Sequence, residues 1–451
     1  MIHKFELGGI KLVLDVNSGA VHIIDDMVWD ILEYGPNFDR KLIYRELGDK
    51  YTKDDLDETL EEIKMLIDEN MLYSKWDTDI HLYKEEPVIK AMCLHIAHDC
   101  NLRCSYCFAS TGDFKGGRSL LDLNTGKNAL DFLVRNSGNR KNLEVDFFGG
   151  EPLMNLHVVK ELVRYGRSLE EKNNKKFKFT ITTNGVLLDR NIIDYINDEF
   201  VNVVISLDGR PEIHNRMRKT VNGKGSYDII LENAKSLVEG RKQKDYYVRG
   251  TFTRENLDFY KDVLHLADCG FEQISIEPVV ASEKEDYSIR EEDLPQIFKS
   301  YEILASEYIK RRREGKWFNF FHFYIDLTQG PCLAKRLIGC GAGNEYIAVT
   351  PQGDIYPCHQ FVGQTEFKMG NVNNDQFDYS MQKRFGANNL LTKEACQNCW
   401  AKFYCTGGCA ANSYNFTGTL DEPYHIGCEM EKKRIECALM IKAVESMESA
   451  Y

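Results

Sequence analysis

Three closely spaced cysteines are the residues of this sequence best suited to chemistry. Cys100, Cys104 and Cys107 are separated by three and then two residues, so their thiols can share one loop. A [4Fe–4S] cube has four irons and favours thiolate ligands, so three cysteines leave one iron open to another ligand. The alternatives are inert core thiols and a zinc site, which needs a fourth protein ligand that His98 or Asp99 is poorly placed to supply. The spacing therefore predicts a cluster with one open iron.

A second group of cysteines lies near the carboxy terminus and contains seven of the fourteen in the chain. Its members are Cys340, Cys358, Cys396, Cys399, Cys405, Cys409 and Cys428. The first residues lack the apolar block of a signal peptide, so we expect a cytoplasmic protein whose clustered thiols bind metal rather than form disulfides. The isolated cysteines are expected to be small buried hydrophobes: Cys93, Cys269 and Cys437.

The elements that must position the first loop follow Pro87, where short apolar runs alternate with amphipathic stretches. This pattern is typical of βα units around a parallel sheet. Strands are expected at 92–96, 143–148, 177–182, 201–207, 246–252 and 274–279, with helices at 123–136, 157–172, 190–197, 227–239 and 258–268. Six such units predict an α/β fold with a partial (β/α)6 barrel, whose reactive groups gather at the carboxyl ends of the strands. The Cys100 loop directly follows the first strand.

Two further units flank the predicted barrel at 91–329. Residues 1–75 have the pattern of short strands followed by three helices, and the charged stretch at 76–90 is expected to be a linker. In residues 330–451 the periodicity weakens while Gly, Asn and Cys become frequent. We expect a loop-rich unit there that metal ligands stabilise in place of a large core, closed by a helix at 429–446.

Charge and hydropathy restrict the partners. The net charge of −13 argues against a broad polyanion-binding surface, so no nucleic acid is expected. The basic triplet Arg311, Arg312 and Arg313 is expected to be a solvated helix face. No apolar stretch approaches the roughly 20 residues of a membrane span, so no membrane partner is expected either.

The first cysteine loop resembles that of the radical S-adenosylmethionine (SAM) superfamily, in which an aromatic residue, here Tyr106, precedes the last cysteine. The resemblance continues on successive strand ends with Gly149, Gly150, Glu151, Asn184, Ser206 and Asp208. It implies that the Gly-Gly-Glu segment contacts the methionine amino group of SAM, where glycine permits close backbone approach. It also implies that the loop after the fourth strand lies beside the ribose.

Two charged residues extend this expected SAM site. Arg218 is a candidate partner for the SAM carboxylate, because guanidinium groups bind carboxylates in a two-pronged arrangement. Glu277 follows the sixth strand and is either a residue that faces the adenosine or an ordinary carboxylate at the start of a helix.

The carboxy-terminal cysteines resemble the SPASM extension of radical SAM enzymes, which holds two auxiliary [4Fe–4S] clusters. Carried over by position, the first cluster has the ligands Cys340, Cys358 and Cys409, and the second has Cys396, Cys399, Cys405 and Cys428. The first is one ligand short. Cys332 is the candidate for that position, and the alternative hypothesis is an open iron that binds and deprotonates a substrate thiol. A zinc ribbon of Cys396, Cys399, Cys405 and Cys409 is the rival interpretation.

The amino-terminal unit resembles the winged-helix recognition element of ribosomal-peptide maturases, which binds a leader peptide at a sheet edge. A DNA-binding winged helix is disfavoured because Asp54, Asp55, Asp57 and Glu58 begin its last predicted helix, and phosphate contact needs the opposite charge. Together with 339–343, 356–363 and 401–410, the chain resembles the maturases of SCIFF peptides, cysteine-rich precursors that receive thioether crosslinks.

The resemblance implies three [4Fe–4S] clusters, SAM, a cysteine-rich precursor peptide with a leader, and an electron donor such as ferredoxin or flavodoxin. SAM cleavage would give a 5′-deoxyadenosyl radical that removes a hydrogen from a peptide carbon, to which a cysteine sulfur then bonds. Two alternatives stay open: an anaerobic sulfatase-maturing enzyme that makes formylglycine, and a noncatalytic iron–sulfur scaffold that binds peptides.

Overall fold

The dominant feature of the computed structural model is one large sheet built around six parallel strands. The structure describes residues 1–75, 87–241, 245–327 and 337–449. The six strands neighbour one another in chain order, as the predicted barrel requires: β4 (Ala91–His98), β7 (Asn142–Gly149), β8 (Lys176–Thr183), β9 (Asn202–Ser206), β11 (Tyr246–Phe252) and β12 (Gln273–Pro278). The predicted α/β fold with a partial barrel is confirmed.

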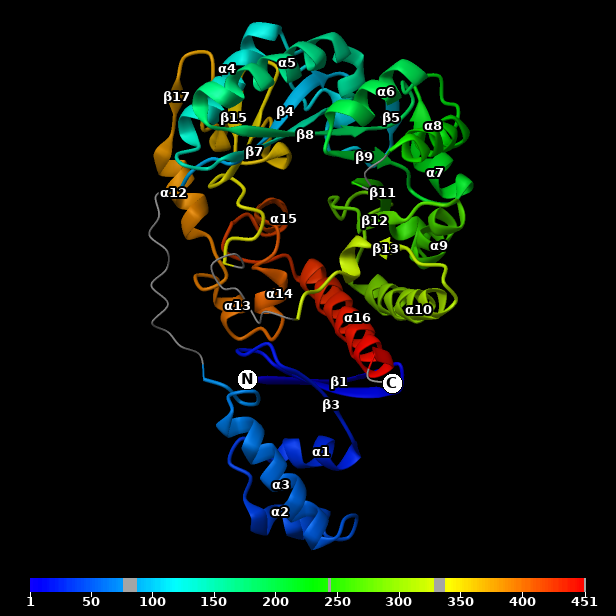
Figure 1. Cartoon of the computed structure of the whole chain (residues 1–451), viewed down its shortest axis with the longest axis vertical. Coiled ribbons are helices and arrows are strands. Elements are labelled where there is room, and N and C mark those ends of the chain that lie inside the picture. Colours follow the sequence, from blue (N-terminus) through cyan, green and yellow to red (C-terminus); the bar gives the residue numbers. More distant parts are fainter. Residues whose placement is uncertain (76–86, 242–244, 328–336, 450–451) are drawn as a thin grey trace.

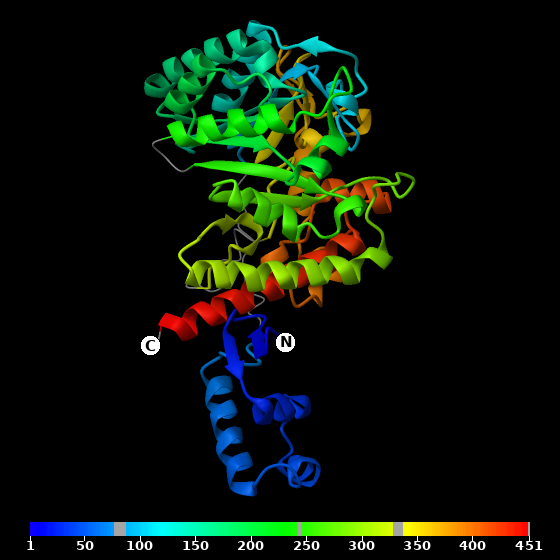
Figure 2. The same ribbon diagram turned by 90° about the vertical axis from the view of Figure 1, so that its right-hand side faces the viewer.

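Helices connect these strands and cover the outer face of the sheet (Figures 1 and 2). The five predicted helices are present as α4 (Leu123–Asn136), α5 (Leu156–Asn173), α6 (Arg190–Glu199), α8 (Tyr227–Gly240) and α9 (Tyr260–Asp268). Side chains that accept backbone hydrogen bonds set the starts of two of them: Asp122 accepts from Asn124 N and Thr125 N, and Asp189 accepts from Ile192 N. In α4 and α6 the capping residue therefore agrees with the apolar spacing on where the helix begins.

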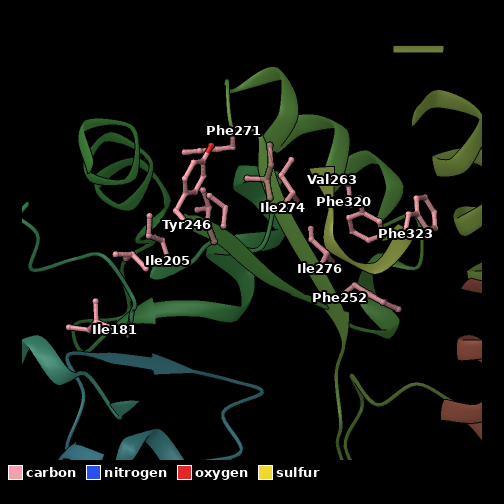
Figure 3. Packing of buried hydrophobic residues seen from close by; sticks show 14 of the residues in the cluster. Ile181, Ile205, Tyr246, Phe252, Val263, Phe271, Ile274, Ile276, Phe320 and Phe323 are labelled. Atoms are coloured by element: carbon pink, nitrogen blue, oxygen red, sulfur yellow. The ribbon is translucent and has the colours of Figure 1, made fainter. Parts of the chain in front are cut away.

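Alternation along the strands separates an apolar outer face from a more polar barrel interior. In β8, Phe177, Phe179 and Ile181 are buried in the main core, whereas Thr180 and Thr182 face the other way. Figure 3 shows the same outer face further along the sheet, where Ile205 and Ile274 lie in the apolar packing. The interior of the barrel is therefore the side available for polar chemistry.

The carboxy-terminal region departs from the predicted loop-rich unit, because it extends the main sheet. Strand β14 (Tyr346–Val349) pairs in parallel with β4. β15 (Asp354–Tyr356), β16 (Gly370–Asn371) and β17 (Gln376–Phe377) then continue the sheet as antiparallel neighbours. Such short strands leave little periodic signal in a sequence. The first barrel strand is thus enclosed on both sides.

Five α-helices of the described residues belong to the same region, and the last of them reaches back across the molecule. α12 (Tyr379–Ala387), α13 (Glu394–Gln397), α14 (Lys402–Cys405) and α15 (Ala410–Thr417) precede α16 (His425–Ser449), which extends past both ends of the helix predicted at 429–446. α16 packs against α10 (Leu294–Arg313), a helix that the sequence patterns did not predict (Figure 2). Within the part of the chain that the structure describes, no helix is long and apolar enough to cross a membrane.

The basic triplet at the end of α10 is largely solvated, as predicted, because Arg312 and Arg313 are exposed, and all three arginines also form ion pairs. Arg311 donates to Asp268 at 2.6 Å, Arg312 to Glu445 at 2.6 Å, and Arg313 to Glu448 at 2.5 Å. The last two acceptors lie on α16. These arginines therefore join α10 to its neighbours.

The amino-terminal unit is a three-stranded antiparallel sheet with helices on one face. The strands β1 (Ile2–Leu7), β2 (Ile10–Asp15) and β3 (Val21–Ile24) are followed by α1 (Asp26–Ile31), α2 (Arg40–Leu47) and α3 (Lys53–Asp68). Val13 packs with the helices, whereas Leu12 and Leu14 on the opposite face join the main core beside α16. The sheet is therefore shared between two cores, and most of the predicted linker at 76–90 lies outside the described residues.

Candidate active site

The first cysteine loop is anchored by backbone pairing on both sides. It leaves β4 and forms the short strand β5 (Leu102–Cys104), which pairs with β10 (Arg218–Thr220) so that Cys104 lies opposite Arg218. Ser105 N donates to Met217 O at 2.8 Å. The structure therefore brings a predicted cationic residue directly beside the cysteines.

The three cysteines line a cavity of about 230 Å³ at the carboxyl ends of the barrel strands. Other predicted residues line it too, namely Tyr106, Gly149, Gly150, Asn184, Ser206, Arg218 and Glu277. Burial, together with the negative charges of Glu151 and Cys104, raises the pKa of Cys100 to about 12. The pKa of Cys104 is also raised by burial and by Cys107, and lowered by Arg218. The thiols thus lie within electrostatic reach of one another, and metal binding would have to displace their protons.

The two predicted glycines let the end of β7 approach the start of the cysteine loop. Gly150 N donates to Ala97 O at 2.7 Å, and Glu151 N donates to Asp99 O at 2.9 Å. Any side chain on Gly150 would collide with the carbonyl group of Asp99. Their small size is therefore needed first for packing against the loop backbone.

The side chains of Glu151 and Asn184 contact other groups than the resemblance implied. The Glu151 carboxylate is fully buried, accepts hydrogen bonds at 2.8 Å from Thr183 Oγ1 and Asn184 N, and is not among the cavity-lining residues. Burial raises its pKa to about 7. The Asn184 amide points to the loop instead, with Nδ2 at 2.7 Å from Asn101 Oδ1 and 3.6 Å from Cys100 Sγ. Glu151 therefore positions the loop that carries Asn184.

Tyr106 links Asp208 to Arg218. Its hydroxyl donates to Asp208 at 2.7 Å and accepts from Arg218 Nη1 at 2.9 Å. Burial raises the pKa of Tyr106 well above its usual range, so the hydroxyl stays protonated. Asp208, like Glu151, is buried behind the cavity wall. Among the described residues, Arg218 Nε has no hydrogen-bond partner although it is buried, so this guanidinium can still accept an anionic ligand.

The opposite wall of the cavity carries residues that sequence reasoning missed. Arg249, on β11, forms an ion pair with Glu277, on β12. His359 and Gln360 belong to the carboxy-terminal region but line the same cavity, with the His359 ring 5.1 Å from that of Phe148. The available signal was their position directly after Cys358. The segment directly after Cys358 therefore reaches the cavity of the first cysteine loop.

The carboxy-terminal thiols fall into two sets. Burial raises the pKa of Cys358, and the charges of Cys409 and Cys340 raise it further. Burial likewise raises the pKa of Cys405 to about 12, to which Glu431 and then the other three cysteines of its set contribute, namely Cys428, Cys396 and Cys399. Cys409 and Cys340 thus lie within electrostatic reach of Cys358, while the division of the ligands between two clusters stays a prediction. The described residues contain no group of three His, Cys, Asp or Glu side chains arranged around a single metal ion.

The remaining cysteines have different surroundings. Cys332, the predicted candidate for the fourth ligand, lies outside the described residues. Cys93 and Cys437 are buried, as expected for small hydrophobes. Cys269 is only partly buried and has its sulfur 3.7 Å from His265 Nε2.

Comparison with known families agrees with this geometry. Residues 94–262 match the radical SAM superfamily, and residues 340–400 match SPASM, an iron–sulfur cluster-binding domain. The chain therefore contains a radical SAM domain followed by a SPASM domain. Its two matched segments contain the first cysteine loop and the start of the carboxy-terminal group.

Several curated proteins are similar in sequence to this radical SAM–SPASM chain over most of its length. A cysteine-type anaerobic sulfatase-maturating enzyme of Clostridium novyi (strain NT) is 27% identical over 362 residues, covering 75% of this chain and 92% of that enzyme. The radical SAM cyclopropyl synthase TigE of Paramaledivibacter caminithermalis is 19% identical over 445 residues, covering 90% of this chain and 87% of TigE.

Solved structures share the fold. The structure of anSMEcpe with bound AdoMet has a TM-score of 0.66 and 20% identity, covering 78% of this radical SAM–SPASM chain and 94% of that chain. Streptococcus suis SuiB bound to S-adenosylmethionine has a TM-score of 0.54 and 17% identity, covering 94% of this chain and 98% of SuiB.

Proposed function

We propose that this radical SAM–SPASM enzyme installs thioether crosslinks, from cysteine sulfur to carbon, in a ribosomally made cysteine-rich precursor peptide. The observation that carries the proposal is the shared cavity, in which the first cysteine loop faces His359 and Gln360, the residues directly after Cys358. A sulfur held at the Cys358 set would therefore lie close to a radical made at the first loop, and proximity of the two reacting groups accelerates bond formation.

The residues around the first loop fit a [4Fe–4S] cluster and SAM. Cys100, Cys104 and Cys107 would hold the cluster and leave one iron for the SAM methionine group. Arg218, whose Nε is buried and unpartnered within the described residues, would bind the SAM carboxylate. Tyr106 and Asp208 would hold that guanidinium in place. When bound, the cluster and SAM supply a 5′-deoxyadenosyl radical, which takes a hydrogen atom from a peptide carbon.

The overall change balances in atoms and electrons. The peptide loses two hydrogens, one as an atom that completes 5′-deoxyadenosine and one as the proton of the cysteine thiol. The electron that remains after the carbon–sulfur bond forms would pass to an auxiliary cluster held by the carboxy-terminal cysteines. A donor such as ferredoxin or flavodoxin would supply the electron that starts the cycle at the first cluster.

The substrate sulfur is assigned to the first auxiliary cluster. Cys340, Cys358 and Cys409 would hold three of its irons, and the fourth iron would bind the peptide thiol and deprotonate it. Cys396, Cys399, Cys405 and Cys428 would hold the second cluster. A Cys332→Ala variant that keeps its full iron content supports this open iron. Loss of one whole auxiliary cluster in that variant would make Cys332 an ordinary ligand.

The amino-terminal unit favours a leader-bearing peptide over a sulfatase. β3 is an edge strand of the small sheet, with β2 as its neighbour in that sheet, and its Ile23 is 45% exposed. An extended leader could add to this edge as a further strand. SuiB matches 94% of this chain, whereas anSMEcpe matches 78%. The wider match to SuiB supports the comparison with peptide maturases.

Sulfatase maturation is the second candidate, and the identity to the Clostridium novyi enzyme favours it. One incubation separates the possibilities: reconstituted protein, SAM, dithionite, and a synthetic cysteine-rich peptide that carries a leader. Thioether formation gives a peptide lighter by two hydrogens with one fewer alkylatable thiol. Formylglycine gives an aldehyde that reacts with a hydrazide. An unchanged peptide mass would contradict both, and would leave a noncatalytic scaffold.

A further inference from the structure

A second cavity, of about 330 Å³, opens between the barrel and the carboxy-terminal helices. Its walls come from the segment after β13 (Asn319–Phe320), from α14 and from α16, which lie between the barrel and the amino-terminal unit in Figure 1. Two of its aromatic side chains are open to solvent, Phe321 at 50% and Tyr324 at 77% exposure. Large exposed rings beside a cavity are typical of a surface that binds another molecule.

One strand, β12, lies between this second cavity and the cavity of the first cysteine loop. His322 Nε2 lies 3.1 Å from Ser275 Oγ, and Ser275 is on β12. Side chains two residues apart on a strand share a face, so Ser275 lies on the same side as Glu277. Glu277 lines the cavity that contains the first cysteine loop. Side chains on one face of β12 therefore lie between one cavity and the other.

A second connection leads to the Cys340 set. Thr406 lines this cavity and also the small pocket that Cys340 lines. A Cβ atom on Gly339 would lie 3.1 Å from Thr406 Oγ1, so the chain before Cys340 passes close by. Cys340 itself is exposed. A molecule in the second cavity can therefore reach towards the thiol set that would bind the substrate sulfur.

The third connection leads to the amino-terminal unit. Arg434, Ile435 and Ala438 of α16 form one wall of the cavity. In the same stretch of helix, Glu436 lies 3.0 Å from the ring nitrogen of His3 on β1. A chain that leaves the small sheet thus meets the second cavity along α16 before it reaches the barrel.

On the basis of the function proposed above, we propose that the second cavity holds the precursor peptide between its leader and the cysteine to be crosslinked. The occupant is an extended peptide segment with a bulky apolar side chain against Phe321 and Tyr324. The chemistry of the walls suits such a segment, because the rings offer apolar surface while Arg434, paired with Glu431 and 2.8 Å from His322 Nδ1, offers donors at the base. Among the cavities described here, only this one lies near the first-loop cavity, the Cys340 set and the amino-terminal unit, which are the three places that the peptide must reach.

Photocrosslinking tests this placement in the full-length, reconstituted protein. Tyr324 is replaced by p-benzoylphenylalanine, and the probe is the same synthetic cysteine-rich peptide with its leader. Tyr379 on α12, which is 58% exposed and away from this cavity, is the matched control position. We expect peptide adducts at 324 that unlabelled peptide competes away, and none at 379. Equal labelling at both positions, or none at either, would overturn the proposal.

Kinetics separate this proposal from the function it rests on. Phe321→Ala and Tyr324→Ala should each raise KM for the peptide about tenfold, as expected for loss of one aromatic contact, with KM for SAM and iron content unchanged. If both variants form the thioether with a normal KM for the peptide, the proposal that the peptide binds in this cavity is refuted, and the proposed function is not. If the wild-type protein forms no thioether, the proposed function is wrong, and adducts at 324 still report whether a peptide binds here.

Discussion

The two groups of cysteines differ in how far the polypeptide itself positions them. The first loop is fixed by pairing between β5 and β10 and by hydrogen bonds from Gly150 N and Glu151 N to the chain before Cys100. In the second group, Cys396 and Cys405 lie on α13 and α14, helices of four residues each. Helices this short are not stable by themselves.

This contrast indicates two ways to build an iron–sulfur site. The barrel preforms the first, because its strands bury apolar side chains whether or not metal is bound. The second is expected to gain much of its order from the clusters, since metal binding and folding share one free energy. Radical generation and substrate capture would then respond differently to the same perturbations.

The largest expected effect comes from the first loop. Cys100→Ala, Cys104→Ala or Cys107→Ala should reduce 5′-deoxyadenosine formation to background, measured by chromatography of the nucleoside, because each removes a cluster ligand. The melting temperature should change by only about 3 °C, whereas Cys405→Ala should lower it more. Cys269→Ala is the control and should keep full activity. An equal loss of stability at Cys104 and Cys405 would remove the contrast.

Iron removal should separate the two regions next. In chelated protein, amides of residues 394–428 should exchange hydrogen at least about tenfold faster, while those of β7 and β8 keep their protection. Hydrogen exchange with mass spectrometry measures both in one experiment. Uniform protection after chelation would show that the second group is preformed as well.

A smaller effect is expected from the SAM carboxylate partner. Arg218→Lys should weaken SAM binding by about ten- to hundredfold, because lysine cannot reproduce the two-pronged contact. Equilibrium binding of SAM to the reconstituted protein is the measurement. The matched control is Arg216→Lys, two residues before Arg218. Arg216 forms a surface ion pair with Glu255, so this variant should bind SAM normally. Equal affinity in the two variants would argue against Arg218 as the carboxylate site.

The smallest expected effect concerns pH and the barrel alone. Burial raises the pKa of Asp146 from its ordinary value to about 7, so the folded barrel favours the protonated form. Stability from this group is therefore present at low pH and is lost as the pH rises through 7. Compared with Asp146→Asn, the wild-type protein should lose on the order of 1 kcal/mol of unfolding free energy between pH 6 and pH 8. Parallel denaturation curves for the two proteins would contradict this.

Long amphipathic elements explain why so much of the barrel could be predicted from the sequence. The helix expected at 123–136 is α4, Leu123–Asn136, because its apolar spacing and the Asp122 cap agree. The strands were predictable because a short apolar run recurs in each βα unit. The cysteine loop followed from its position after the first strand.

Features that depend on tertiary contact could not be predicted in the same way. Pairing of β14 with β4 joins chain segments about 250 residues apart, a separation no local pattern encodes. Glu151 belongs to a strong sequence motif, yet its buried partners Thr183 and Asn184 turn it away from the cavity. His359 was passed over because its placement depends on that same long-range sheet.

Deuterium transfer tests the central claim, that a radical made at the first loop acts on a peptide whose sulfur is held at the second group. The reconstituted protein is incubated with SAM, dithionite and the precursor peptide carrying deuterium on its carbon positions. We predict one deuterium in 5′-deoxyadenosine for each crosslink, matched by the loss of one alkylatable thiol. Peptide crosslinks formed with undeuterated 5′-deoxyadenosine would contradict the account.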